Sequence, residues 1–466
     1  MEICINGQKQ QKRELEIYVH IPFCVKKCAY CDFLSGPATK EEQEAYVEAL
    51  LKEIAEFGQA EGERSEKPDA MKCREAKNAG ADIVKLSDYT VVSVFFGGGT
   101  PSILEAEQIG KILTLLKERF EFQKDVEISI ECNPGTANQQ KLEAYRAYGI
   151  NRISFGLQSA DNEELKLLGR IHTWEQFLET YRAARKAGFS NINVDLMSSL
   201  PGQSVDSWKE TLEKVLELEP EHISAYSLII EEGTPFYERY EADARLREEG
   251  EVPKYLPSED AEREMYRLTE VMLQRAGMKR YEISNYAKEG YECRHNVGYW
   301  IGTEYVGFGL GAASYLRKEK LETWETNAGL LEREGTAVLK SEADASWRDG
   351  KSAVKKEYKD SFCAAMKRVQ NTPVIQKYLD NNFEREIEEL SQNDQMAEFM
   401  FLGLRMMCGV EEAEFQRRFE QDIDAVYGAV LEEQCRLGLL ERNDGWIRLT
   451  PKGVDLSNMV MAEFLL

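Results

Sequence analysis

Six short apolar runs, each followed by a helical pattern, constrain the fold of this chain most strongly. They lie at residues 16–21, 90–96, 126–131, 152–155, 191–197 and 222–229. Short apolar strands that alternate with helices are typical of a parallel sheet. We therefore expect an α/β fold in which six β/α units form a partial, open barrel. Polar motifs follow these strands, and in such folds ligands bind where the carboxyl ends of the strands converge.

Three cysteines follow the first predicted strand. Cys24, Cys28 and Cys31 are separated by three and then two residues. Thiolates are the usual ligands of iron–sulfur clusters, and four normally close a [4Fe–4S] cube. Cys31 is followed by Asp32 and Phe33, so three thiolates would leave one iron open. The alternatives are a zinc knuckle and a redox dithiol, but a structural zinc site normally needs four ligands, which makes the cluster the favoured interpretation.

The C-x3-C-x2-C spacing resembles the cluster motif of the radical S-adenosylmethionine (SAM) family. The string Tyr-Val-His-Ile-Pro-Phe-Cys, from Tyr18 to Cys24, resembles the branch that contains oxygen-independent coproporphyrinogen III oxidases and HemW-type haem chaperones. The resemblance implies a [4Fe–4S] cluster on Cys24, Cys28 and Cys31, with SAM bound to the open iron through its amino and carboxylate groups. One electron from a donor would then split SAM into methionine and a 5′-deoxyadenosyl radical. The resemblance covers nearly the whole chain, apart from two presumed insertions.

The same resemblance implies a set of SAM contacts, most of them at predicted strand ends. The loop from Gly97 to Pro101 is rich in glycine, which lets a backbone approach a ligand closely. Two carboxylates end strands, and ribose hydroxyls are good donors to carboxylates. For each residue, a helix cap, an ion pair or core packing is the alternative. The implied SAM-binding residues are Tyr18, Tyr30, Gly98, Gly99, Thr100, Glu131, Gln158, Arg170, Asp195, Ile229 and Ala313.

Two features separate the members of this branch. The oxidases carry a further cysteine two positions after the third, where this chain has Phe33. The segment His295-Asn296-Val297-Gly298-Tyr299-Trp300 matches the His-Asn-x-x-Tyr-Trp signature of the HemW type. Imidazole can ligate haem iron axially, so His295 is the candidate haem ligand; a packed histidine beside a Tyr-Trp core pair is the alternative. We expect a haem chaperone that delivers haem to acceptor proteins. The alternative is an enzyme that decarboxylates coproporphyrinogen III propionates to vinyls, and enzymatic activity stays open.

Composition limits the remaining function classes. The formal net charge is −24, which argues against nucleic-acid binding because that requires basic patches. No apolar run approaches the ~20 residues needed to span a bilayer, which leaves only peripheral membrane contact open. The polar start of the chain lacks an apolar signal core, so we expect a cytoplasmic protein. Its ten cysteines are then interpreted as reduced thiols and metal ligands.

The sequence also suggests a division into domains. Residues 1–13 form a tail, and residues 14–235 form the barrel, with an inserted loop at 58–88. Residues 236–316 extend the barrel and carry the His295 motif, and residues 317–367 form a charged insertion or linker. Residues 368–466 form a C-terminal domain with helices and a hairpin around Asp444-Gly445, the pattern of a winged-helix-like fold.

Overall fold

The computed structural model describes residues 3–5, 8–10, 12–57, 86–317, 331–332 and 365–466. Six parallel strands lie in chain order at the centre of its main sheet. This arrangement confirms the predicted α/β fold with a partial barrel. Most strands are longer than predicted, but the last ends at residue 227 rather than 229. The six strands are β3 (Arg13–Ile21), β4 (Tyr89–Gly98), β5 (Phe122–Cys132), β6 (Arg152–Gln158), β7 (Ile192–Ser198) and β8 (His222–Ser227).

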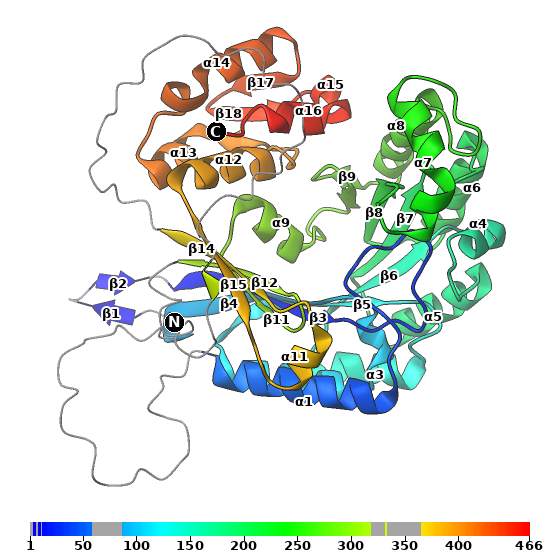
Figure 1. The fold of residues 1–466 in the computed structure, drawn as a ribbon, viewed down its shortest axis with the longest axis vertical. Helices are drawn as coiled ribbons and strands as arrows, with labels where there is room; N and C mark the ends of the chain where they lie inside the picture. The colour runs from blue at the N-terminus through cyan, green and yellow to red at the C-terminus, as the bar shows by residue number, and fades with distance from the viewer. Residues whose placement is uncertain (1–2, 6–7, 11, 58–85, 318–330, 333–364) are drawn as a thin grey trace.

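Helices connect these strands and cover the outer face of the sheet (Figure 1). The first begins after Thr39, whose hydroxyl accepts a hydrogen bond from the Glu42 backbone, and the Glu42 carboxylate accepts one from the Thr39 backbone. Such a capping box satisfies two otherwise unpaired N–H groups. The helices are α1 (Lys40–Glu56), α2 (Ala106–Arg119), α3 (Gln139–Tyr148), α4 (Asn162–Leu167), α5 (Trp174–Lys186), α6 (Val205–Leu216), α7 (Pro235–Glu248) and α8 (Glu259–Arg275).

The two faces of the central sheet differ in polarity. Residues such as Ile17, Val19 and Ile130 are buried in the hydrophobic core that the strands share with the outer helices. Because side chains alternate along a strand, the neighbouring positions face the barrel interior, and these include Glu16 and Arg152, which are also buried. Buried polar groups require hydrogen-bond partners. The inner face of the barrel is therefore polar, and this polar inner face, the chamber, suits a polar ligand.

The sheet continues past both edges of the barrel. Next to β3 lie the parallel strand β11 (Tyr305–Phe308) and the antiparallel strands β12 (Ala313–Arg317), β14 (Met366–Asn371) and β15 (Arg385–Leu390), with β13 (Leu331–Glu332) beyond them. At the other edge are β10 (Asn285–Ala287) and β9 (Lys279–Arg280). The predicted domain start at residue 368 therefore differs from the sheet topology, because β14 and β15 pair within the main sheet. Residues 58–85, 318–330 and 333–364 of the two predicted insertions lie outside the described residues.

A separate C-terminal unit begins near Ser391 and packs its own apolar core. Its hairpin turns at Asp444 and Gly445, whose φ angles are 53° and 79°. Positive φ at both positions is the requirement of a two-residue type I′ turn, so the predicted hairpin is confirmed. The unit contains α12 (Gln392–Gly403), α13 (Glu412–Phe419), α14 (Ile423–Arg436), α15 (Pro451–Asp455) and α16 (Ser457–Ala462), with β16 (Val410–Glu411), β17 (Leu440–Asn443) and β18 (Trp446–Leu449).

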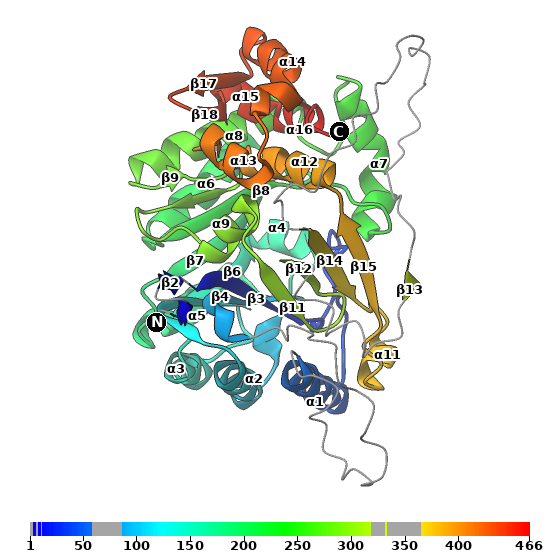
Figure 2. The same ribbon diagram turned by 90° about the vertical axis from the view of Figure 1, so that its left-hand side faces the viewer.

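One short helix links the barrel to this unit. The helix α9 (Arg294–Ile301) contacts both β4 and α12, and it lies below the C-terminal helices in Figure 2. It carries the His295 motif. Within the described residues, no helix has the length and apolar character that crossing a membrane requires.

Candidate functional site

The three cysteines lie in the loop that follows β3, with their thiols free and partly exposed. The loop closes on itself, because the Cys24 N–H donates to the Gly36 carbonyl at 2.9 Å and the Gly36 N–H donates to the Pro22 carbonyl at 3.0 Å. The Thr100 hydroxyl lies 3.5 Å from the Cys24 sulfur. All of these contacts hold the loop at the carboxyl end of the sheet, as predicted.

The glycine loop after β4 packs directly beneath the cysteine loop. The Gly99 N–H donates to the Ile21 carbonyl at 2.8 Å, and the Thr100 N–H donates to the Phe23 carbonyl at 2.7 Å. A Cβ at Gly99 would lie 2.6 Å from the Phe23 carbonyl oxygen, so only glycine fits there. Gly98 has a φ of 110° and no space for a side chain beside the His20 ring. Two of the N–H groups in this loop are therefore already used by the protein.

Arg170 joins the cysteine loop to the barrel. Its guanidinium donates to the Cys28 sulfur at 3.5 Å, to the Asn133 side-chain oxygen at 2.5 Å and to the Gly156 carbonyl. It also interacts with the Tyr30 hydroxyl. Its Nε is buried and has no partner among the described residues. Arg170 therefore bridges the cysteine loop, β6 and the end of β5.

The two predicted carboxylates lie inside the barrel. Asp195 accepts hydrogen bonds from the Asn193 amide at 2.7 Å and from the Ser154 hydroxyl at 3.1 Å. Burial, followed by the nearby charge of Asp195, raises the pKa of Glu131 to about 8. Burial likewise raises the pKa of Asp195. Two acidic groups held together in a buried chamber attract donors and cationic ligands.

Gln158 ends β6 in an unusual backbone conformation. Its φ is 77°, and the pairing of β6 with β7 is irregular between Gly156 and Gln158. Its side-chain oxygen accepts a hydrogen bond from the Tyr226 hydroxyl at 2.8 Å. A non-glycine residue in the left-handed region costs of order 1–3 kcal/mol and persists where its surroundings fix it, often at functional sites.

The remaining predicted SAM contacts lie at separate places in the fold. Tyr18 projects into the barrel, and its hydroxyl lies 3.0 Å from His20 Nδ1. His20 Nε2 donates to the Leu34 carbonyl at 3.0 Å, so Nδ1 carries no proton and accepts a hydrogen bond from Tyr18. Ala313 begins β12 and pairs with Gln370. Ile229 lies beyond β8 and its side chain is 67% exposed. The structure thus brings the cysteine loop, Thr100 and Arg170 together. Ile229 is exposed and Ala313 lies in a strand on the far side of β11.

His295 lies in the barrel interior. Its Nδ1 is 2.8 Å from the Ser93 hydroxyl, which itself donates to Glu16 at 3.1 Å. That hydroxyl proton is directed to Glu16, which favours the tautomer with its proton on Nδ1 and an unprotonated Nε2. Burial, with a smaller contribution from Arg152, lowers the pKa of His295 to about 3. The ring is therefore neutral at physiological pH.

The residues fit the groups that the motif implies. Within the described ranges, no three His, Cys, Asp or Glu side chains are arranged around a single metal ion. Three thiols from one loop, with polar donors at two of the sulfurs, suit an iron–sulfur cluster, whose properties depend on hydrogen bonds to sulfur. The adjacent chamber, with its two carboxylates and the unpartnered Arg170 Nε, suits a ligand with both hydroxyl and charged groups.

Three contributors to the site escaped sequence reasoning. Asn133 donates to the Thr100 hydroxyl at 2.7 Å and accepts from Arg170, Tyr226 holds Gln158, and Asn193 holds Asp195. The period of two along β7 and β8 could have placed Asn193 and Tyr226 on the inward face. Asn133 lies two residues after Glu131, where the strand has ended.

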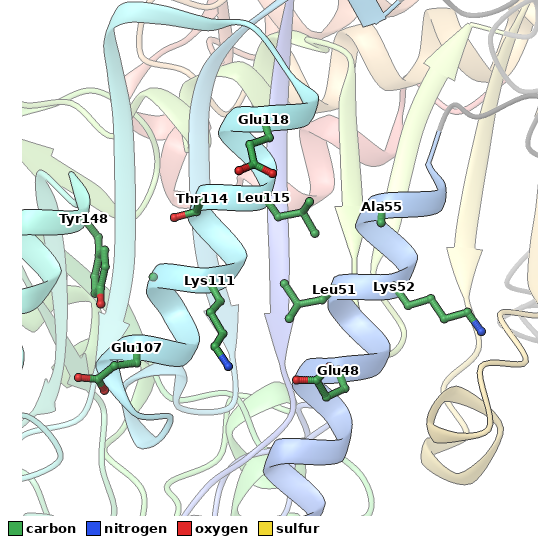
Figure 3. Close-up of a pocket in the computed structure, with 11 residues that line it drawn as sticks. Glu48, Leu51, Lys52, Ala55, Glu107, Lys111, Thr114, Leu115, Glu118 and Tyr148 are labelled. Atoms are coloured by element: carbon green, nitrogen blue, oxygen red, sulfur yellow. The ribbon is translucent and has the colours of Figure 1, made fainter. Parts of the chain in front are cut away.

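A separate pocket lies on the outside of the barrel, between α1 and α2 (Figure 3). Charged side chains such as Glu48, Lys52 and Lys111 line it, with Tyr148 of α3 at one side. None of the predicted site residues takes part in it. It is therefore separate from the predicted site inside the barrel.

Comparison with known proteins agrees with this assignment. Residues 18–215 match the Radical SAM superfamily and residues 390–456 match the HemN C-terminal domain. The chain is 32% identical to the heme chaperone HemW of Lactococcus lactis over 452 residues, which cover 96% of this chain and 97% of the relative. It is 29% identical to the heme chaperone HemW of Bacillus subtilis, over 96% of this chain and 98% of the relative.

The fold has a close counterpart among solved structures. Coproporphyrinogen III oxidase (HemN) from Escherichia coli, a radical SAM enzyme, superimposes with a TM-score of 0.68 and 22% identity, over 97% of this chain and 90% of that one. This likeness concerns the fold. The full-length similarity to the HemW relatives is what assigns the branch, and the chain belongs to the HemW family within the radical SAM superfamily.

Proposed function

We propose that this chain is a haem chaperone that holds a [4Fe–4S] cluster and SAM, binds haem and passes it to acceptor proteins. The observation that carries the proposal is the three-thiol loop beside a polar chamber, in a chain similar over nearly its whole length to proteins named heme chaperone HemW. Cluster and SAM together would supply one-electron chemistry, for which an electron donor is required. The free thiols fit a reducing compartment such as the cytoplasm.

Cys24, Cys28 and Cys31 are the proposed cluster ligands. Thiolates rather than thiols bind metals. Burial raises the pKa of Cys31, so the neighbouring positive groups matter. The Arg170 guanidinium donates a hydrogen bond to the Cys28 sulfur.

The chamber residues are the proposed SAM contacts. The Gly99 and Thr100 N–H groups are already bonded to the protein, so this loop can offer carbonyl oxygens, which is what an ammonium group needs. Glu131 and Asp195 would accept from ribose hydroxyls, and Gln158 and Arg170 would donate to ligand oxygens. Tyr18, Tyr30, Ile229 and Ala313 complete the proposed set as packing or backbone contacts.

The cysteine loop also offers a surface for a large apolar ligand. Val25, Phe33 and Leu34 are exposed around the thiols, and Phe33 is 66% exposed. Lys26 and Lys27 beside them are exposed cations in a strongly acidic chain. An apolar rim with adjacent positive charge matches a porphyrin that carries carboxylates.

His295 remains the proposed axial ligand of the haem iron. A ligating histidine commonly donates its other N–H to a protein acceptor, which fixes the tautomer, and the Ser93 bond does this at Nδ1. The unprotonated Nε2 is then the ligating atom. Since the ring is stacked inside the barrel, ligation requires α9 to move away from β4.

Iron content tests the cluster. Protein prepared anaerobically should be brown and hold about four irons per chain, as one cube requires. Replacing Cys24, Cys28 and Cys31 by alanine should abolish this iron, whereas Cys408→Ala, at an exposed cysteine of the C-terminal unit, should not. Equal iron in both variants would eliminate the proposed ligands.

Haem titration tests the cargo. We compare the Soret spectra of wild type, His295→Ala and His295→Asn, the last of which keeps a side-chain N–H for the Ser93 bond but cannot act as an imidazole ligand. Both variants should lose the axial-ligand signature and bind haem more weakly. Spectra identical to wild type would exclude His295 as the ligand, and transfer of haem from loaded protein to an apo-haemoprotein then tests chaperone activity separately.

A porphyrin assay separates the chaperone from the oxidase. Reduced holoprotein is incubated with SAM and coproporphyrinogen III, and the products are analysed. A chaperone should yield no protoporphyrinogen at useful turnover. Sustained formation of that product would replace the proposed function by coproporphyrinogen III decarboxylation.

A further inference from the structure

A continuous chain of hydrogen bonds joins Asp195 to the start of α9. The Asn193 amide nitrogen donates to Asp195 at 2.7 Å, and the Asn193 oxygen lies 2.6 Å from His222 Nδ1. On the other side of its ring, His222 Nε2 lies 2.8 Å from the Tyr281 hydroxyl. That hydroxyl accepts the Cys293 backbone N–H at 3.3 Å. Cys293 is the residue that immediately precedes α9.

The donors and acceptors in this chain can be assigned in one direction only. The Asn193 nitrogen faces the Asp195 carboxylate and the Ser154 hydroxyl, and its oxygen accepts from the Ser224 hydroxyl as well. A flipped amide would place an oxygen against a carboxylate. His222 therefore donates from Nδ1 and accepts the Tyr281 proton at Nε2. Rotation of any one group would leave buried polar atoms unpaired, which costs about 1–3 kcal/mol each.

The far end of this hydrogen-bond chain is attached to α9 and to the C-terminal unit. Glu127 of β5 accepts hydrogen bonds from the Arg294 and His295 backbones at 3.0 and 3.4 Å. The Tyr281 carbonyl accepts from the Met407 backbone at 2.9 Å, which ties the same residue to the C-terminal unit. Tyr281 thus contacts the barrel, α9 and the C-terminal unit.

We infer that Asn193, His222 and Tyr281 are positioning residues that couple occupancy of the SAM site to the position of α9, the helix that carries His295. This inference rests on the proposed function, since it takes Asp195 as a SAM contact. A ligand hydroxyl bonded to Asp195 fixes that carboxylate, and the series of hydrogen bonds through Asn193, His222 and Tyr281 transmits the restraint to the Cys293 N–H. Because coupling between two sites is reciprocal, displacement of α9 must weaken SAM binding by the same factor.

Hydrogen exchange of the holoprotein measures the coupling directly. Amide exchange at residues 293–297 is followed with and without saturating SAM, and the dissociation constant of SAM is measured by equilibrium dialysis. In wild type, SAM should slow exchange at these amides by roughly fivefold or more, the lower range of typical couplings. In Tyr281→Phe, which lacks the oxygen that Cys293 requires, SAM should still bind but should leave their exchange unchanged.

Two further variants keep the test decisive. His222→Gln interrupts the chain one step nearer to Asp195 and should give the same loss. Tyr145→Phe is the matched control, because it also removes a buried hydroxyl, one without a partner among the described residues, and it should retain the wild-type response. If wild type binds SAM but α9 exchange does not change, or changes equally in Tyr281→Phe, the coupling is refuted while the proposed function stands. If wild type binds no SAM, both fail.

Discussion

The imidazole of His295 lies nearly parallel to the phenyl ring of Phe95, with ring centroids 5.2 Å apart and an interplanar angle of 22°. The Tyr18 ring stacks near both of them. The helix α9, which carries the His295 motif, is thus packed against the barrel interior through its histidine. The same contact buries a titratable group at the centre of the fold.

The buried histidine should make stability depend on acid pH. Its pKa is about 3 in the folded protein, against 6.5 for an ordinary histidine, so the unfolded chain binds more protons between these values. The stabilisation is complete above pH 6.5 and is lost as the pH falls toward 3, by at most about 1.4 kcal/mol per pH unit. Denaturant unfolding between pH 7 and pH 5 measures this slope.

His295→Gln should reduce the pH dependence of unfolding by the contribution of about one bound proton. His172 and His222, whose pKa values are also lowered by burial, should still contribute to the slope that remains. A slope that is the same in the variant would mean that His295 is not buried in its neutral form.

Gly99 should be indispensable for the cluster loop. An alanine Cβ there would meet the Phe23 carbonyl oxygen at 2.6 Å. Because that oxygen belongs to the backbone and the Cβ is fixed to the backbone, the clash cannot be relieved without moving the cysteine loop. We expect Gly99→Ala to lose most of its iron after anaerobic reconstitution. Gly36→Ala, in the cysteine loop itself, is the matched control, because nothing lies within 4 Å of its added Cβ. Full iron content in Gly99→Ala would contradict the packing argument.

Sequence reasoning recovered the features that depend on local patterns. The turn at Asp444-Gly445 and the alternation of the central strands with helices both follow from short-range rules. The three-cysteine loop also lies where the spacing indicated. Long-range pairing was not accessible: β14 and β15 join the main sheet through partners far away in the chain, and Arg385 reaches Glu53 across 332 positions. The left-handed backbone of Gln158 likewise carries no signal in its residue type.

The positive φ angle of Gln158 allows the cost of backbone strain to be separated from the contribution of its side chain. Replacing it by glycine removes the cost of a positive φ but also loses the Tyr226 hydrogen bond, worth ~1 kcal/mol. Gln158→Gly should therefore keep stability within about 1 kcal/mol of wild type, whereas Gln158→Ala keeps the strain and should be destabilised by ~1–2 kcal/mol. Both should bind SAM more weakly, as measured by equilibrium dialysis. Equal stability of the two variants would show that the backbone is not strained.

Glu53 should be among the most sensitive positions for stability. This buried carboxylate of α1 accepts from the Gly309 backbone at 2.9 Å, from Asn371 and Tyr378 at 2.7 Å each, and from Arg385 at 3.3 Å. Glu53→Gln removes the carboxylate that faces the buried Arg385 guanidinium and should cost about 3–5 kcal/mol. The double variant with Arg385→Gln should cost less than the sum of the two single changes. Lys209→Ala, at an exposed ion pair, should cost below ~0.5 kcal/mol.

Glu131 should make SAM affinity depend on pH. Burial and the Asp195 charge raise the pKa of Glu131, and the Gly98 N–H and Arg152 lower it, which gives a value of about 8. The carboxyl is therefore mostly protonated at pH 7 before a ligand binds. A ligand that carries positive charge and donates hydroxyl hydrogen bonds favours the carboxylate, and binding then releases a proton. The dissociation constant should therefore fall as the pH rises from about 6.5 to 8, by at most about tenfold per unit for one proton.

An α-amino group also titrates near pH 7.7–8.0 in model compounds, so wild type must be compared with Glu131→Gln under identical conditions. The variant keeps the shape of the side chain but cannot ionise, and its pH profile should be flatter than that of wild type by up to one proton. Parallel profiles would show that Glu131 does not change its protonation when SAM binds.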